Sequence, residues 1–292
     1  MNNYSIWLLE YGYCSTQPLS SLVFGKHNEG TTTIPFTFVI LKGNGHTIAL
    51  DTGYYDEGYA HILTERFGVD KMIPIEESLA SIGISGEEVD TVILTHMHYD
   101  HAGGIKAFPN AHFYIQEQEF LGWMKVLAKP REFDFLSIAI DPNDVKNMID
   151  LMFENRLSFV DGDVKDILPG IDLVPVFNAH TYGLQLVTIT NTDAEGNPDT
   201  WVFTTDGCYV FDNFGHRDFD GVYRPVGFGV GSLTEMVKAL DTIMKLSNNR
   251  MDRMIMTHET KMWEMYPTKA DKNGMHTAEI VLADGEKSRV QS

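Results

Sequence analysis

Histidine and aspartate are concentrated in one short run, His96-Met97-His98-Tyr99-Asp100-His101. Neutral imidazoles and carboxylates are ligands for zinc and other first-row divalent ions. A tight loop can aim alternate side chains at different points, so His96 and His98 can bind one ion while Asp100 and His101 turn toward a second. The run therefore predicts a centre of two metal ions, which is the arrangement that two-metal hydrolysis requires.

Each ion needs further ligands, and the chain places ligand types where strands are expected to end. The apolar runs 172–177, 200–205 and 254–257 have the composition of buried strands. A histidine or an aspartate follows each of them: His180, Asp206 and His258. The two-ion hypothesis thus gains three more candidate ligands.

The predicted elements favour two mixed β-sheets with helices on their outer faces, an α/β (α+β) class. We expect one domain over residues 1–292, in which the polar tail after Tyr266 frays or packs weakly. The predicted strands are 34–41, 47–50, 91–95, 112–115, 172–177, 184–190, 200–205 and 254–257, and the predicted helices are 57–67, 76–82, 117–127, 143–155 and 234–246.

Composition excludes several classes of protein. A hydrophobic fraction of 43% in 292 residues supports a sizeable core, and a net charge of -19 opposes binding to nucleic acid. The start of the chain lacks the pattern of a signal peptide or a membrane span, which predicts a cytoplasmic protein. Cys14 and Cys208 form neither a disulfide framework nor a metal-binding pair. The sequence leaves the oligomeric state open, with a homo-oligomer as one option.

The order H-x-H-x-D-H, then His180, Asp206 and His258, resembles the metallo-β-lactamase superfamily over roughly residues 34–260. Asp51-Thr52-Gly53 is similar to the motif that ends an early strand of that family, where the aspartate supports the site from behind the ligands. The resemblance implies an αβ/βα four-layer sandwich. It also implies two divalent ions, with zinc expected and manganese, iron or cobalt as alternatives.

Carried over to this chain, the resemblance implies which residues bind each ion. The first ion would be bound by His96, His98 and His180, and the second by Asp100, His101 and His258. Asp206 would bridge the two ions. His98 stands where the diiron flavoprotein branch has glutamate, and Asp206 supplies a bridge that true β-lactamases lack, so both branches fall away.

Tyr209 points to a subgroup, because the pattern Asp206-x-x-Tyr209 resembles the N-acyl-homoserine lactonases. In that group the tyrosine hydroxyl reaches the substrate carbonyl. The implied reaction is the opening of a lactone by a hydroxide that bridges the ions, with the oxyanion stabilised by the first ion and Tyr209. Asp100 would carry a proton to the leaving alkoxide. The partner is then a small molecule with a hydrolysable carbonyl.

Two departures from the lactonase pattern concern the substrate more than the chemistry. His180-Thr181-Tyr182-Gly183 has tyrosine where the lactonases usually have proline, and its ring could enter the pocket. The aromatic segment at about 117–160 is interpreted either as a lid over the substrate or as a helix packed on the core. Arg217 and Arg224 could bind a substrate carboxylate, although exposed arginines are ordinary.

Several further residues of reactive type are expected to have no role in the site. Cys208 is expected to be a buried thiol, and the remaining histidines are expected not to be ligands: His27, His46, His61, His112, His216 and His276. Other functions also stay open: hydrolysis of another ester, cyclic amide or amide at the same centre, and a metal-binding sensor without turnover. A phosphodiesterase is disfavoured by the acidic chain, which lacks a basic channel.

Overall fold

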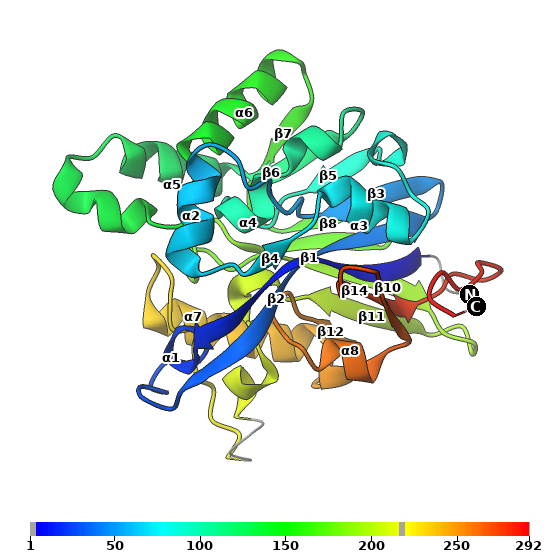
Figure 1. Ribbon diagram of the computed structural model, residues 1–292. Helices are drawn as coiled ribbons and strands as arrows, with labels where there is room; N and C mark the ends of the chain where they lie inside the picture. Colours follow the sequence, from blue (N-terminus) through cyan, green and yellow to red (C-terminus); the bar gives the residue numbers. More distant parts are fainter. Residues whose placement is uncertain (1–3, 216–219, 292) are drawn as a thin grey trace.

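The computed structural model describes residues 4–215 and 220–291, and its centre is a pair of facing mixed β-sheets (Figure 1). The larger sheet has the strand order β13-β14-β1-β2-β3-β5-β6-β7, and β4 pairs with β1 outside this path. The strands from β3 to β7 are parallel, and the other pairs are antiparallel. Its members are β1 (Tyr4–Pro18), β2 (Thr31–Gly43), β3 (His46–Leu50), β4 (Lys71–Met72), β5 (Thr91–Ile93), β6 (His112–Gln116), β7 (Leu157–Val160), β13 (Thr268–Ala270) and β14 (His276–Val281).

The smaller sheet has the order β12-β11-β10-β9-β8. Its strands β11 and β12 are parallel, and the remaining pairs are antiparallel. The members are β8 (Val164–Leu168), β9 (Ile171–Pro175), β10 (Gln185–Thr192), β11 (Pro198–Phe203) and β12 (Met254–Ile255).

Helices lie on the outer side of each sheet, which completes four layers (Figure 1). Those on the side of the larger sheet are α2 (Tyr59–Phe67), α3 (Ile75–Ser81), α5 (Glu117–Leu127) and α6 (Pro142–Phe153); those on the side of the smaller sheet are α7 (Leu233–Leu246) and α8 (Met262–Met265). The short helices α1 (Leu19–Leu22) and α4 (Tyr99–Ala102) lie in loops. The predicted αβ/βα sandwich is confirmed. Within the described ranges, no helix is long and apolar enough to cross a membrane.

The strand β1 shows how the layers are held together, because it is buried on both faces. Successive side chains of a strand point to opposite sides. Ile6 and Leu8 pack in a cluster with Ile189 of the smaller sheet, whereas Trp7 packs in a second cluster with Leu79 of α3. One strand therefore contributes to the core between the sheets and to the core under the helices.

The topology brings the candidate ligands to one edge. The parallel pairs β3–β5 and β11–β12 each end at a common side of their sheet. Asp51 follows β3, the run from His96 follows β5, Asp206 follows β11 and His258 follows β12. Loops from both sheets thus converge on a single region.

Every predicted strand and helix is present, with bounds shifted by a few residues. The strand β1 was not predicted, and the expectation that the tail after Tyr266 frays or packs weakly was wrong, since the tail forms β13 and β14. β1 has no period of two to reveal it, since both of its faces are apolar. The polar strand β14 pairs with β1, and Glu279 accepts hydrogen bonds from the Trp7 indole at 3.2 Å and from the Arg289 amide at 2.9 Å. Backbone pairing with β1 and hydrogen bonds to Glu279 hold this segment in place, although its sequence has no clear apolar run.

The packing of β14 predicts a large cost for a charge inside it. Ala278 is fully buried beside β1, so Ala278→Asp places an unpaired carboxylate in the core and should lower the free energy of unfolding by about 3 kcal/mol or more. Lys272→Asp, at an exposed turn position, is the matched control. Urea denaturation measures both; equal and small effects would mean that the tail packs weakly after all.

Candidate metal centre

The loop that carries the first candidate ligands is fixed by the segment after β3. The four candidate ligands in this loop are all buried: His96, His98, Asp100 and His101. Thr52 donates from both its backbone amide and its hydroxyl to the His101 carbonyl, each at 2.8 Å. A side chain at Gly104 would meet the Thr52 carbonyl oxygen at 2.1 Å, so only glycine permits this close approach.

Seven candidate ligands gather in two groups. One ligand atom from each member lies within 4.8 Å of the others in each group, and the groups are His96, His98, His180 and Asp206, and Asp100, His101 and His258. These are the seven residues that the sequence analysis selected. The structure brings them together, and their role as ligands stays a prediction.

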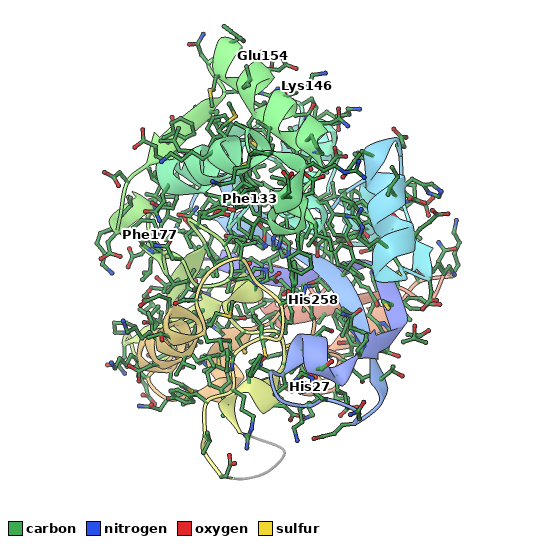
Figure 2. All side chains as sticks on the ribbon, turned by 90° about the vertical axis from the view of Figure 1, so that its left-hand side faces the viewer. His27, Phe133, Lys146, Glu154, Phe177 and His258 are labelled. Carbon is green, nitrogen blue, oxygen red and sulfur yellow. The ribbon has the colours of Figure 1, made fainter. Side chains whose placement is uncertain are left out.

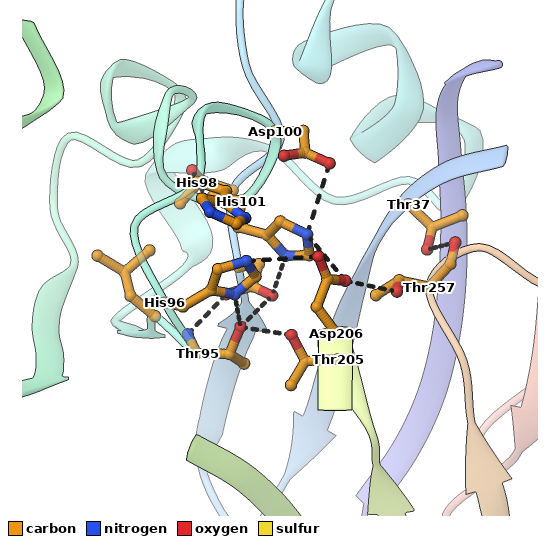
Figure 3. Close-up of polar contacts among 12 residues, drawn as sticks. Thr37, Thr95, His96, His98, Asp100, His101, Thr205, Asp206 and Thr257 are labelled. Atoms are coloured by element: carbon orange, nitrogen blue, oxygen red, sulfur yellow. Dashed lines mark hydrogen bonds and ion pairs between the residues drawn. The ribbon is translucent and has the colours of Figure 1, made fainter. Parts of the chain in front are cut away.

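Asp206 lies between the groups, and each of its carboxylate oxygens faces one of them (Figure 3). Oδ2 lies 3.5 Å from His96 Nε2 and 3.1 Å from His180 Nε2. Oδ1 lies 3.3 Å from His101 Nε2 and 3.4 Å from His258 Nε2. A carboxylate placed in this way can coordinate one ion with each oxygen.

The outer nitrogens of four histidines have partners that orient the rings. His180 Nδ1 donates to the Phe228 carbonyl at 3.0 Å, and His258 Nδ1 donates to the Pro35 carbonyl at 2.8 Å. The other two pairs are His101 Nδ1 with the Asp51 carboxylate at 2.7 Å and His96 Nδ1 with the Thr95 hydroxyl at 3.0 Å. Each bond leaves Nε2 pointing inward as a lone-pair donor, which is the usual arrangement behind a metal-binding histidine.

Unsatisfied nitrogens mark the centre of the cluster. The Nε2 atoms of His96, His98 and His101 are buried and have no hydrogen-bond partner among the described residues. A buried polar atom without a partner costs about 1–3 kcal/mol, so native proteins rarely keep several together. The donor set and these orphaned atoms fit a pair of divalent cations.

The electrostatics of the cluster favour bound cations as well. Burial, together with the neighbouring imidazoles, holds the pKa of His96 and His98 well below the usual range, so both rings are neutral and able to bind metal. Burial opposes ionisation of Asp206, but the charges of His101, His258 and His180 hold its pKa well below normal. Burial lowers the pKa of His101 and His258, but the neighbouring carboxylates outweigh it and raise the pKa of both rings. Protons on these rings therefore balance the buried carboxylates, and binding of divalent cations would release them.

Strained backbone places two of the residues. Asp51 and Thr205 have positive φ angles of 62° and 44°, a region that side chains with a Cβ rarely adopt. Thr95 links them, because its amide and hydroxyl donate to the Asp51 carboxylate and its hydroxyl lies 2.7 Å from that of Thr205. Such strain persists where surrounding contacts hold the backbone in place. Here the strained residue Thr205 directly precedes Asp206, and the strained residue Asp51 bonds to His101.

A cavity of about 320 Å³ opens onto the cluster. Asp100, Asp206, His258 and Tyr209 lie at its polar end. The Tyr209 ring lies 4.9 Å from that of His258 and 5.6 Å from that of His180. Most of the remaining wall is apolar, and its residues were not assigned to the site from the sequence: Pro18, Leu22, Ile34, Phe36, Phe67 and Phe228.

The segment at about 117–160 contributes little to this wall among the described residues. Only Ala139 of the segment lines the cavity, although in Figure 2 Phe133 lies above His258 on the same face. The Tyr182 ring packs on Trp123 at 5.1 Å and does not line the cavity. The alternatives of a lid and a packed helix both stay predictions, as does the single domain.

The other candidates are placed away from the chemistry. Cys208 is a buried thiol as expected, and burial raises its pKa well above normal. Arg224 forms an ion pair with Asp220, while Arg217 and His216 lie outside the described residues.

Removal of metal should destabilise the protein. Ions that bind only the folded state add about 2.7 kcal/mol when their free concentration is about 100 times Kd. We expect a chelator to lower the Tm of the wild type, and zinc to restore it. His180→Ala should lose most of this shift, whereas His112→Ala should keep it because His112 bonds to Ser158 outside the cluster. An equal zinc-dependent shift in all three proteins, measured by calorimetry, would remove His180 from the ligand set.

Comparison with known proteins agrees with the fold. The family model of the metallo-beta-lactamase superfamily matches residues 31–175. N-acyl homoserine lactonase AiiB of Agrobacterium fabrum is 22% identical over 191 residues, which are 62% of this chain and 66% of that protein. An N-acyl homoserine lactonase of Bacillus cereus is 29% identical over 169 residues, 58% of this chain and 56% of that protein. The alignments thus span less than two thirds of these relatives.

A solved structure extends the likeness over nearly the whole chain. The dizinc quorum-quenching lactonase AidC, in complex with a product, superimposes with a TM-score of 0.62 at 18% identity and covers 97% of each chain. That likeness concerns the fold. Together with the match to the family model and the gathered histidines and aspartates, it leads to one conclusion: residues 31–175 belong to the metallo-β-lactamase superfamily, and the chain has the fold of that superfamily.

Proposed function

We propose that the protein is a metal-dependent hydrolase that opens a lactone ring. The observation that carries the proposal is the position of Asp206, whose two oxygens face two separate groups of ligand atoms. Two divalent ions held there would activate a shared water at neutral pH and polarise a carbonyl group. Zinc is the expected metal, with manganese, iron or cobalt as alternatives, since the donor set accepts each of them.

The proposed ligands of the two ions follow the two groups of ligand atoms. His96, His98 and His180 would hold the first ion, and Asp206 would bridge to the second. The second ion would be held by a group of three residues: Asp100, His101 and His258.

Tyr209 supplies a hydrogen-bond donor beside this centre. Burial, and secondarily the charge of Asp206, raise the pKa of Tyr209 well above normal, so the phenol keeps its proton at working pH. Its hydroxyl would donate to the substrate oxygen that gains charge. Asp100, which lines the same cavity, would transfer a proton to the alkoxide that leaves the ring.

The walls of the cavity suit a substrate with an apolar part. Beyond the polar end, the lining consists mainly of aliphatic and aromatic side chains, which favour burial of an acyl or alkyl group. The names of the relatives support a lactone as the reacting group. An ester, cyclic amide or amide would present a similar carbonyl to the same ligands, so these substrates are the alternative outcomes of the test.

A substrate panel tests the proposal. With two equivalents of zinc or manganese, kcat/KM should be highest for lactones with an acyl chain, lower for aryl esters, and lowest for lactams and amides, as measured by proton release. Asp206→Asn is the control for turnover at this centre. A higher kcat/KM for an amide than for any lactone would contradict the lactonase assignment. Binding of both ions without any turnover would favour the sensor.

Tyr209→Phe should lower kcat on the order of 10- to 100-fold, because it removes one donor to the developing oxyanion. Metal content should stay at the wild-type value, since the seven gathered histidines and aspartates supply ligands for both ions without the phenol. Tyr182→Phe is the matched control, because its ring packs on Trp123 outside the cavity. Initial rates and metal analysis on the same samples check this prediction, and an unchanged kcat would remove Tyr209 from the mechanism.

A further inference from the structure

We propose that Glu119 is a positioning residue that sets the spacing between the His98 loop and the His180 loop. The inference rests on the proposed metal centre, because it concerns the ligands of the first ion. Glu119 lies in the first turn of α5 and is fully buried. It does not belong to either group of candidate ligands.

The Glu119 carboxylate joins two segments that lie far apart in the sequence. Oε1 accepts hydrogen bonds from the Met97 amide at 2.9 Å and the Trp123 indole at 2.7 Å. Oε2 accepts from the Thr181 hydroxyl at 2.8 Å and the Gly183 amide at 2.5 Å. Met97 stands between His96 and His98, and Thr181 directly follows His180, so one side chain contacts both loops that supply the first ion.

Hydrogen-bond donors surround both oxygens of the carboxylate. Burial raises the pKa of Glu119, but its hydrogen bonds oppose that shift. Three of the four partners are N–H groups, which can only donate. Hydrogen bonds to a charged acceptor are roughly twice as strong as neutral ones, which makes Glu119 a firm connection between the loops.

His98 is the ligand that needs such a connection. Its Nδ1 lies 2.9 Å from His180 Nε2, inside the cluster, and its Nε2 has no partner among the described residues. It therefore lacks the outer hydrogen bond that orients the other four rings. Instead, its ring packs against Trp123 at 5.6 Å. Glu119 thus acts on His98 twice, through the Met97 amide and through Trp123.

The backbone is shaped to admit this contact. A Cβ at Gly183 would lie 2.4 Å from the Glu119 amide nitrogen, and one at Gly122 would lie 2.4 Å from Cγ of Tyr182. Two glycines, one on each side, therefore allow α5 to approach the loop after His180. The start of α5 is a fixed part of the site in this arrangement, whatever the rest of the segment 117–160 does.

Glu119→Gln tests the inference, because an amide offers one accepting oxygen in place of two. The NH2 group would then face either the Met97 and Trp123 donors or those of Thr181 and Gly183. We expect one of the two zinc ions to bind about 10- to 100-fold more weakly, measured by competition with a chromophoric chelator. The Co(II) absorption spectrum should change, and the metal-dependent gain in Tm should shrink. Glu117→Gln, an exposed acid two residues away, should match the wild type.

A purely structural role has a different signature: Tm would fall equally with and without metal, and both affinities would stay unchanged. That result would overturn the inference. If Glu119→Gln does not fold, Thr181→Val removes one donor with little change of shape, and it should weaken one ion by a smaller factor; wild-type affinities in this variant would also overturn the inference. A wild type that binds fewer than two ions would instead refute the proposed metal centre.

Discussion

The structure depends on one buried charge, the carboxylate of Asp206, which lies among four imidazoles in the interior. A carboxylate in such a place is costly unless positive charge compensates it. Protons on His101 and His258 supply part of that charge, because Asp206 outweighs burial and raises the pKa of both rings, and bound cations would displace these protons. The outer hydrogen bonds that turn each Nε2 inward therefore make sense as preparation for cations, and the strained turn at Thr205 is tolerable because it delivers the carboxylate to this position.

The two-sheet architecture explains why the ligands can converge from distant parts of the chain. Strand ends are rigid, and a loop that leaves a strand end inherits its position. The larger sheet delivers Asp51 and the loop from His96, while the smaller sheet delivers Asp206 and His258. Neither sheet alone carries a complete set for two ions. The core that packs the sheets together, with residues such as Ile6 and Ile189, thus also holds the two halves of the site in register.

The sequence predicted the parts of the site in which the signal lies within a short stretch of the chain. The run from His96 and the later ligands after strands were visible because polar residues of metal-binding type follow apolar runs. β1 was not visible because burial on both faces removes the alternation of polar and apolar residues. β14 was not visible because its sequence, His276–Val281, mixes polar and apolar residues without a clear apolar run. Glu119 was overlooked for a similar reason. Its only signal is an acid on the apolar stripe of α5, beside Phe120 and Trp123. Two of its four partners are backbone amides, which no side-chain pattern reveals.

Phe228 and Pro35 each serve the site through the backbone. Phe228 lines the cavity, while its carbonyl oxygen accepts the hydrogen bond from His180. Pro35 stands in the sequence between the cavity residues Ile34 and Phe36, and its carbonyl oxygen accepts the hydrogen bond from His258. A carbonyl is the same whichever side chain its residue carries. The walls around the substrate can therefore be exchanged without loss of these hydrogen bonds, so selectivity for the substrate and affinity for the metal can diverge separately in proteins built on this plan.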